Sequence, residues 1–264
     1  MLKKPAISLL ALMFLLLFTP AAYGKGINID KSKLDSGIIG INYHAAKSVA
    51  TKVLISKDNV EYYYNLKSSD KFPLQLGDGE YKVFVLENVA GNQYKVVGNE
   101  VVSLKLSNPN DVFLQSNQII NWHENMDAIR KAKELTVQTQ SDQEKVAAIY
   151  NYIVNNVKYD YVKANNIDAG YLPSIDGIFK TSQGICYDYA ALFAAMARSA
   201  GVPTKLLMGR KNDIAGYHAW NQVYLKSANK WVTIDITYDS VYVQKGLGIA
   251  MIKDASEYSI EQRY

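Results

Sequence analysis

Three side chains that could together cleave an amide bond occur in order near the end of the sequence: Cys186, His218 and Asp235. A cysteine thiolate is a nucleophile, a histidine beside it can carry protons, and a carboxylate can orient that histidine. Cys186 is the only cysteine among 264 residues, which excludes an intramolecular disulfide and a cysteine-based metal cluster. This lone thiol is therefore either an inert buried residue or a reactive group.

The surroundings of Cys186 favour a reactive thiol. An apolar run over Ala190–Met196 predicts a buried helix that starts near the cysteine and ends at Gly201-Val202-Pro203. The first turn of a helix carries unpaired N–H groups and a partial positive charge, and both favour a thiolate. Gly184, two residues earlier, leaves room for a close approach to the sulfur.

Of the three histidines, His218 has the surroundings expected of a proton carrier. It stands between small residues at the start of a predicted strand, Tyr217–Leu225, where its ring is reachable. His123 is placed on the first predicted helix of this half, and His44 stands alone in a β-rich half. Structural or surface roles are expected for both of these.

Asp235 is an acid inside an apolar predicted strand, Lys230–Thr237, where a buried lone carboxylate is costly unless paired. If Lys226–Asn229 is a four-residue hairpin loop, Trp220 lies opposite Asp235. His218 and Asp235 then share one face of the sheet as diagonal neighbours. A slip of one residue would put them on opposite faces, so the pairing depends on this register.

These segments resemble the core of the transglutaminase-like superfamily. That family's pattern has a Gly-x-Cys helix start, a helix ending in Gly-[Ile/Val]-Pro, a His-Ala-Trp strand and a Trp-x-x-x-Asp-x-Thr strand. All four blocks occur in this order within residues 184–237. The resemblance implies an α+β, papain-like fold in which Cys186 is the nucleophile, His218 is base and acid, and Asp235 orients His218.

Such a site forms a thioester on an amide carbonyl, which water then hydrolyses or a lysine amine turns into a cross-link. The N–H of Cys186 is expected to bind the oxyanion. Trp220 either walls the cleft or lies in the core. No cofactor or metal is expected; calcium is not inferred, since the chain lacks an EF-hand-like loop, and calcium dependence stays open. Candidates for the second oxyanion donor, each with an ordinary loop or sheet role as the alternative, are Gln183, Tyr159, Tyr161 and Tyr171.

The residues before this core have a β pattern. Apolar residues alternate with polar ones in Tyr81–Val85 and Val102–Leu106, and turn signals separate short strands. We predict an antiparallel β-sandwich-like domain over residues 25–108 and the transglutaminase-like α+β domain over residues 109–264. The breaker cluster Ser107–Asp111 lies between them.

Helical spacing predicts two helices ahead of the one at Cys186. Trp122, Met126 and Ile129 share one helical face, and Ser141–Glu144 is a capping box for the next helix. Asp160–Gly177 is rich in Asn, Asp, Gly and Pro, which predicts a loop.

The first 24 residues have the pattern of a secretory signal peptide. Lys3 and Lys4 precede the apolar run Ala6–Phe18, and Ala22-Tyr23-Gly24 suits cleavage after Gly24. We expect a secreted protein with no further membrane span; an uncleaved anchor is the alternative. A net charge of +4 without a basic patch argues against nucleic acid. The expected partner is a protein or peptide substrate, which can be associated with the cell wall.

Two other functions stay open. The chain could be a non-catalytic cell-surface or wall-binding protein that keeps the core as a scaffold and binds through its tyrosine-rich β domain. Alternatively, Cys186 could form an intermolecular disulfide, as an unpaired thiol in a secreted protein. The presence of Cys186, His218 and Asp235 together favours the enzyme.

Overall fold

The computed structural model describes residues 15–17, 27–45, 49–67, 69–168 and 170–264. Of the expected signal segment, only Leu15–Leu17 is among them; the rest lies outside the described residues. The chain divides into two compact units, each built from several segments. The first contains the described parts of Met1–Asp30, Ile41–Asp70 and Gly79–Ser103, and the second those of Lys31–Gly40, Lys71–Asp78 and Leu104–Tyr264.

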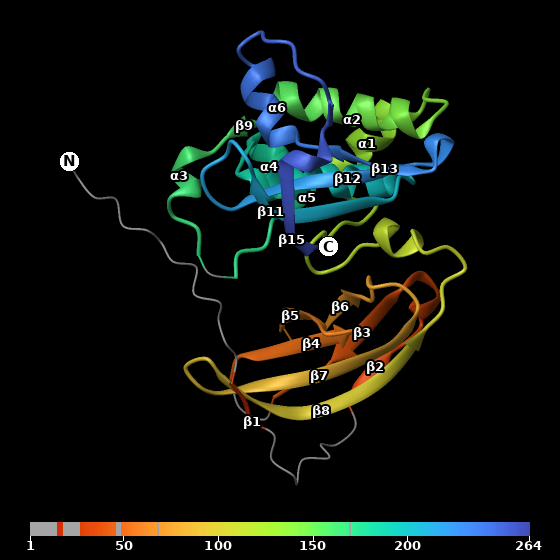
Figure 1. Ribbon diagram of the computed structural model, residues 1–264, viewed down its shortest axis with the longest axis vertical. Coiled ribbons are helices and arrows are strands. Elements are labelled where there is room, and N and C mark those ends of the chain that lie inside the picture. Colours follow the sequence, from red (N-terminus) through yellow and green to blue (C-terminus); the bar gives the residue numbers. More distant parts are fainter. Residues whose placement is uncertain (1–14, 18–26, 46–48, 68, 169) are drawn as a thin grey trace, which may run out of the picture. The chain divides into compact units, whose positions relative to one another are not determined.

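A five-stranded sheet forms the main part of the first unit, in the order β1-β8-β7-β4-β5 (Figure 1). β4 pairs antiparallel with β5 and β7, whereas β1 pairs parallel with β8. Apolar residues alternate between its faces because side chains of a strand have a period of two; Leu54 and Leu86 cluster with Tyr94. The strands are β1 (Leu15–Leu17), β4 (Thr51–Lys57), β5 (Val60–Leu66), β7 (Gly79–Ala90) and β8 (Gln93–Leu104).

The β pattern of this half is therefore confirmed, with one difference in its strands. The segment Val102–Leu106, expected as a short strand of its own, forms the end of one longer strand, β8, as far as Leu104. Residues Tyr94, Gly98, Val102 and Leu104 are all buried, so the alternation runs through the glycine without a change of face. A separate three-stranded sheet has the order β2-β3-β6 and consists of β2 (Asn28–Asp30), β3 (Ile38–Asn42) and β6 (Ser69–Pro73), with η1 (Leu34–Ser36) between β2 and β3.

The second unit packs helices against another five-stranded sheet, so the α+β class is confirmed (Figure 1). The sheet order is β14-β13-β12-β11-β15, and α5 packs on β11 and β12. Every residue of α5 from Asp188 to Arg198 is buried, as its apolar run predicts. The strands are β11 (Thr204–Lys211), β12 (His218–Leu225), β13 (Lys230–Ile234), β14 (Ile252–Lys253) and β15 (Tyr258–Arg263).

Two helical predictions are confirmed at their ends. α5 begins at Cys186, and the Ser141 Oγ accepts the Glu144 N–H at 3.2 Å to cap α2. None of the described helices is long and apolar enough to cross a membrane. The helices are α1 (Asp127–Thr136), α2 (Asp142–Asn156), α3 (Tyr161–Ala164), α4 (Ile175–Thr181), α5 (Cys186–Ser199) and α6 (Ile236–Val243), with short 3₁₀ turns η2 (Asp111–Leu114), η3 (Lys226–Ala228) and η4 (Ala255–Glu257).

Three boundary predictions are wrong. α1 begins at Asp127, so Trp122 lies outside it. The predicted loop Asp160–Gly177 contains α3 and the start of α4, because Asp160 Oδ1 accepts the Lys163 N–H at 2.8 Å and caps a single turn. A helix this short shows no apolar periodicity.

The strand predicted to reach Thr237 ends at Ile234, because the Asp235 side chain caps α6. Its Oδ1 accepts the Tyr238 N–H at 3.1 Å. The hairpin register itself is confirmed from Leu225 opposite Lys230 to Asn221 opposite Ile234. Asp235 thus leaves the sheet directly after that register has brought it towards β12.

Candidate active site

Cys186 is the first residue of α5 and is partly exposed. The strand pair just before it, β9 (Lys158–Tyr159) and β10 (Gln183–Gly184), runs parallel and sets the entry of the chain into the helix. A Cβ on Gly184 would lie 2.6 Å from the Cβ of Asp188, so only glycine allows this close approach. The N–H of the first helical residue has no acceptor within the helix. The Cys186 N–H can therefore donate to a group bound beside the sulfur.

His218 and Asp235 are brought together, as the hairpin register predicts. His218 Nε2 lies 2.8 Å from Asp235 Oδ2, and the two side chains are 5% and 0% exposed. Trp220 is 1% exposed and stacks on His218 with 6.1 Å between ring centroids. Trp220 thus lies in the core, which is one of the two positions expected for it.

The proton affinity of His218 reflects both neighbours. Burial lowers its pKa, but the hydrogen bond and the charge of Asp235, together with the interaction with Cys186, raise it to about 9. Asp235 occupies Nε2, so Nδ1 is the ring nitrogen left for Cys186. A histidine that binds its proton tightly beside a thiol favours an ion pair between the two.

The carboxylate of Asp235 has a further partner that the sequence analysis missed. The Tyr258 hydroxyl donates to Asp235 Oδ2 at 3.1 Å. Tyr258 begins β15, and its ring lies 4.9 Å from that of Trp220. It is one of 20 tyrosines, and no local pattern distinguishes it in the sequence.

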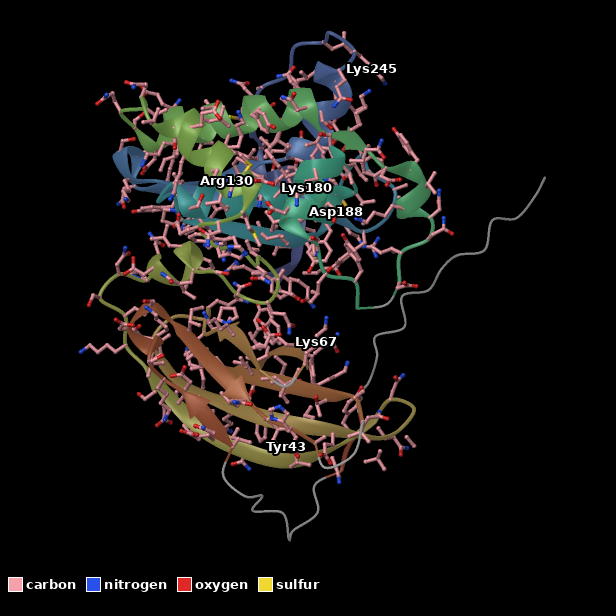
Figure 2. All side chains as sticks on the ribbon, turned by 180° about the vertical axis from the view of Figure 1, so that it is seen from behind. Tyr43, Lys67, Arg130, Lys180, Asp188 and Lys245 are labelled. Carbon is pink, nitrogen blue, oxygen red and sulfur yellow. The ribbon has the colours of Figure 1, made fainter. Side chains whose placement is uncertain are left out.

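A second buried carboxylate, Asp188, lies in the first turn of α5 (Figure 2). It accepts hydrogen bonds from the Ile185 N–H at 3.0 Å and the Tyr171 hydroxyl at 2.6 Å. Lys163 Nζ lies 2.5 Å from the same carboxylate and forms an ion pair with it. Lys163 was also missed, although a buried acid requires such a partner. These bonds fix α3 and the segment around Tyr171 to the start of α5.

The four candidates for the second oxyanion donor have different environments. The Tyr171 hydroxyl is committed to Asp188, Tyr161 is 68% exposed, and the Gln183 side chain is exposed. Tyr159 is half-buried; burial, followed by the charge of Cys186, raises its pKa to about 12. Tyr159 is therefore the candidate whose hydroxyl has a pKa that is raised by the charge of Cys186.

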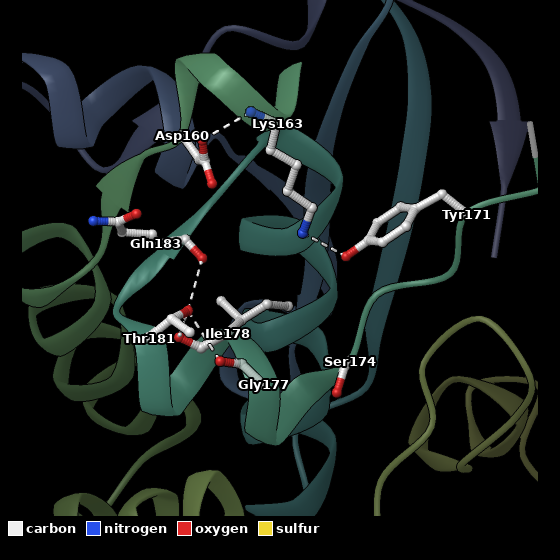
Figure 3. A pocket seen from close by; sticks show the side chains of 8 residues that line it. All are labelled: Asp160, Lys163, Tyr171, Ser174, Gly177, Ile178, Thr181 and Gln183. Carbon is white, nitrogen blue, oxygen red and sulfur yellow. Dashed lines mark hydrogen bonds between the residues drawn. The ribbon is translucent and has the colours of Figure 1, made fainter. Parts of the chain in front are cut away.

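A pocket of about 270 Å³ lies beside this ion pair (Figure 3). Figure 3 shows Lys163 Nζ and the Tyr171 hydroxyl pointing towards one another at its wall, where they are 2.6 Å apart. Its other lining residues are Asp160, Ser174, Gly177, Ile178, Thr181 and Gln183. Gln183, one of these lining residues, is three residues from Cys186 in the sequence.

Replacing Lys163 by methionine is expected to destabilise the second unit, because the buried Asp188 carboxylate loses the cation that balances its charge. Breaking a fully buried ion pair costs about 3–5 kcal/mol, and we expect about 2 kcal/mol since solvent screens Lys163 in part. The Lys163 side chain is 28% exposed. Urea unfolding of Lys163→Met measures this loss.

The double variant Lys163→Met/Asp188→Asn is expected to recover most of that stability, because no unpaired charge remains buried. Lys180→Met is the matched control: its side chain is 65% exposed and lies 3.9 Å from Asp127. Equal losses in the single and double variants would mean that the ion pair is not what stabilises this end of α5.

The raised pKa of His218 predicts a pH-dependent contribution to stability. The folded protein holds a proton that the unfolded chain releases near pH 6.5, so the stabilisation is complete below about pH 6.5. It is lost as the pH rises through the folded-state pKa, about 9. In Asp235→Asn only the interaction with Cys186 still opposes burial, so the His218 pKa is expected to fall below its value in the parent protein. Histidine NMR titration measures both values; a midpoint near 6.5 in the parent protein would refute the coupling.

Among the described residues, no group of three or more His, Cys, Asp or Glu side chains could hold a metal ion. His44 and His123 are both exposed, and neither lies in a described helix or strand.

The site at the start of α5 combines the thiol of Cys186, the imidazole of His218 and the carboxylate of Asp235, and it can support nucleophilic attack followed by proton transfer.

Comparison with known proteins matches residues 129–236 to the model of the transglutaminase-like superfamily core. The mouse kyphoscoliosis peptidase is 33% identical over 118 residues, which cover 40% of this chain and only 17% of that protein. A UPF0252 protein of Methanocaldococcus jannaschii is 30% identical over 119 residues, or 33% of its length. The solved periplasmic domain of TgpA from Pseudomonas aeruginosa aligns with 84% of this chain and 96% of its own, at 14% identity and a TM-score of 0.40.

Proposed function

Residues 129–236 match the model of the transglutaminase-like superfamily core, and on this premise we propose that the chain is a thiol enzyme that forms a thioester on an amide carbonyl. The observation that supports this most strongly is the buried bond of 2.8 Å between His218 and Asp235, with His218 interacting with the thiol at the start of α5. A scaffold that only binds would not need a buried carboxylate paired with a buried histidine, since burying both is costly.

In the proposed reaction, the Cys186 sulfur forms a bond to the amide carbonyl carbon and the carbonyl oxygen becomes an oxyanion. The Cys186 N–H donates to that oxyanion, and Tyr159 is the side-chain donor that we favour. Collapse of the oxyanion breaks the carbon–nitrogen bond. His218 gives its proton to the departing amine, and the acyl group stays on the sulfur as a thioester.

The second half of the reaction decides between two activities. His218, now neutral, can take a proton from water, whose attack releases an acid, or from a lysine amine, whose attack forms a new amide. One relative reported above is named a peptidase, and the family whose model matches is named after the transglutaminases. We propose a protein or peptide as the substrate for either outcome.

Incubation of the protein with casein and a tagged primary amine separates these activities. Incorporation of the tag identifies acyl transfer, and fragments without the tag identify hydrolysis. The absence of both, under reducing conditions that keep the thiol free, would contradict the proposal and favour the non-catalytic binding protein.

We also propose that the protein acts outside the cytoplasm, on the basis of the basic, apolar and small residues at its start. An unpaired cysteine is then exposed to oxidation, so a disulfide-linked dimer through Cys186 is the competing state. Fractionation of cells that produce the full chain tests the location. Non-reducing gel electrophoresis of the secreted fraction tests the dimer, which would block the proposed reaction.

A further inference from the structure

The strand β15 approaches β11 very closely at the level of His218. Gly209 of β11 pairs with His218 on one side and with Ile260 of β15 on the other. A Cβ on Gly209 would lie 2.0 Å from the Ser259 carbonyl oxygen, so glycine is needed for this contact. This packing places the first residue of β15, Tyr258, against the carboxylate that holds His218.

Tyr258 contacts this carboxylate and the ring beneath the histidine at the same time. Its hydroxyl donates to Asp235 Oδ2 at 3.1 Å, and the same oxygen lies 2.8 Å from His218 Nε2. Its ring lies 4.9 Å from that of Trp220, which in turn stacks on His218. The Tyr258 side chain therefore contacts both the carboxylate that is hydrogen-bonded to His218 and the indole ring that stacks on it.

We propose that Tyr258 is a positioning residue of this site: its hydroxyl fixes the Asp235 carboxylate and shares its negative charge, which sets the orientation and proton affinity of His218. The inference rests on the proposed function. It goes beyond the family match, because the matched residues end at 236 and Tyr258 lies outside them.

The chemistry of the hydrogen bond gives the direction of its effect. A donor to a carboxylate stabilises the charged form and draws electron density from it. Burial, followed by the charge and the hydrogen bond of Asp235, holds the pKa of Tyr258 well above its usual range, so its hydroxyl remains a donor in any practical assay. Without that donor, the Asp235 charge depends more on His218, which then binds its proton more tightly.

Other titratable groups lie near Asp235 and stay in place when the Tyr258 hydroxyl is removed. Asp239, one turn further along α6, has its pKa raised to about 6, chiefly by burial. Because the same groups are present in parent and variant, their difference reports the hydroxyl. By element, these groups are Cys186 of α5, His218 of β12, Asp239 of α6, Tyr150 of α2, which donates to Asp239 at 2.8 Å, and Lys253 of β14, which lies 2.5 Å from Asp239.

Histidine NMR titration of Tyr258→Phe tests the inference without any assay of activity. Both proteins carry Cys186→Ala so that the thiol does not titrate. The proton affinity of His218 is expected to rise about threefold to tenfold in the variant. This range corresponds to part of the free energy of the hydrogen bond that Tyr258 donates to the charged carboxylate. Tyr224→Phe is the control, because its hydroxyl bonds Asn229 at the other end of β12. A shift no larger than in this control would overturn the proposal.

Kinetics give the second readout, on chains that retain Cys186. Tyr258→Phe is expected to lower kcat about tenfold and to leave KM unchanged, because the hydroxyl acts through His218 and not on bound substrate. In an Asp235→Asn background the same substitution is expected to have no further effect. An additive effect there, or a change in KM alone, would contradict a role through Asp235. If the parent protein shows neither acyl transfer nor hydrolysis, the proposed function fails, while the NMR comparison still decides the role of Tyr258.

Discussion

Cys186→Ala is expected to lower amine incorporation and peptide cleavage by about 10⁵-fold or more, to the background rate. The substitution removes the only atom that can form the thioester, and neither His218 nor Asp235 can replace it. Cys186 is partly exposed at the start of α5, so the loss of its sulfur is expected to cost less than about 1 kcal/mol in stability. Steady-state rates and urea unfolding of the same preparation check both statements.

The matched control for this prediction lies at the other end of the same helix. The Ser199 hydroxyl donates to the Met196 carbonyl at 2.8 Å, and Ser199→Ala is expected to keep full activity. Full activity in Cys186→Ala would exclude the thiol mechanism. Equal loss in both variants would indicate damage to α5 and not to the nucleophile.

Asp235→Asn is expected to lower kcat by about 10⁴-fold, the loss typical of an orienting carboxylate. The amide can still accept the Tyr238 N–H and cap α6, so the backbone is expected to stay in place. Its NH₂ group cannot accept the proton on His218 Nε2, which favours the opposite tautomer and removes the partner of the imidazolium. The pH–rate profile measures the second effect.

The expected result for Asp235→Asn is a large fall in kcat with little change in KM, together with residual activity that increases with pH. In this variant His218 is neutral at lower pH and no longer forms an ion pair with the thiolate. A higher pH is therefore needed to ionise Cys186. An activity within about tenfold of the parent would contradict the role assigned to Asp235.

The sequence predicts the central part of this site well, because the information is local. Cys186 follows a glycine and opens an apolar helix, and the four-residue loop after Leu225 determines the register of β12 and β13. That register is enough to bring His218 towards Asp235. Two of the boundaries that were predicted wrongly are places at which a side-chain cap replaces backbone pairing, as Asp160 and Asp235 do.

The supporting residues could not be predicted in this way, since their partners are distant in the sequence. Lys163 pairs with an acid 25 residues away, and Tyr258 donates to one 23 residues away. A buried acid signals that some partner exists, but lysines and tyrosines are too common in this chain for the partner to be chosen. The continuity of β8 was not predicted either, although Tyr94, Gly98 and Val102 all lie on its buried face.

The central claim is that Cys186 carries the acyl group, and trapping that intermediate tests it most directly. The protein is mixed with a tagged glutamine-containing peptide, quenched in acid within one turnover, digested and analysed by mass spectrometry. We predict a thioester on the fragment with Cys186, absent from Cys186→Ala and discharged by added amine or by water. Turnover of the same peptide with no adduct on Cys186, or with the adduct on another residue, would contradict it.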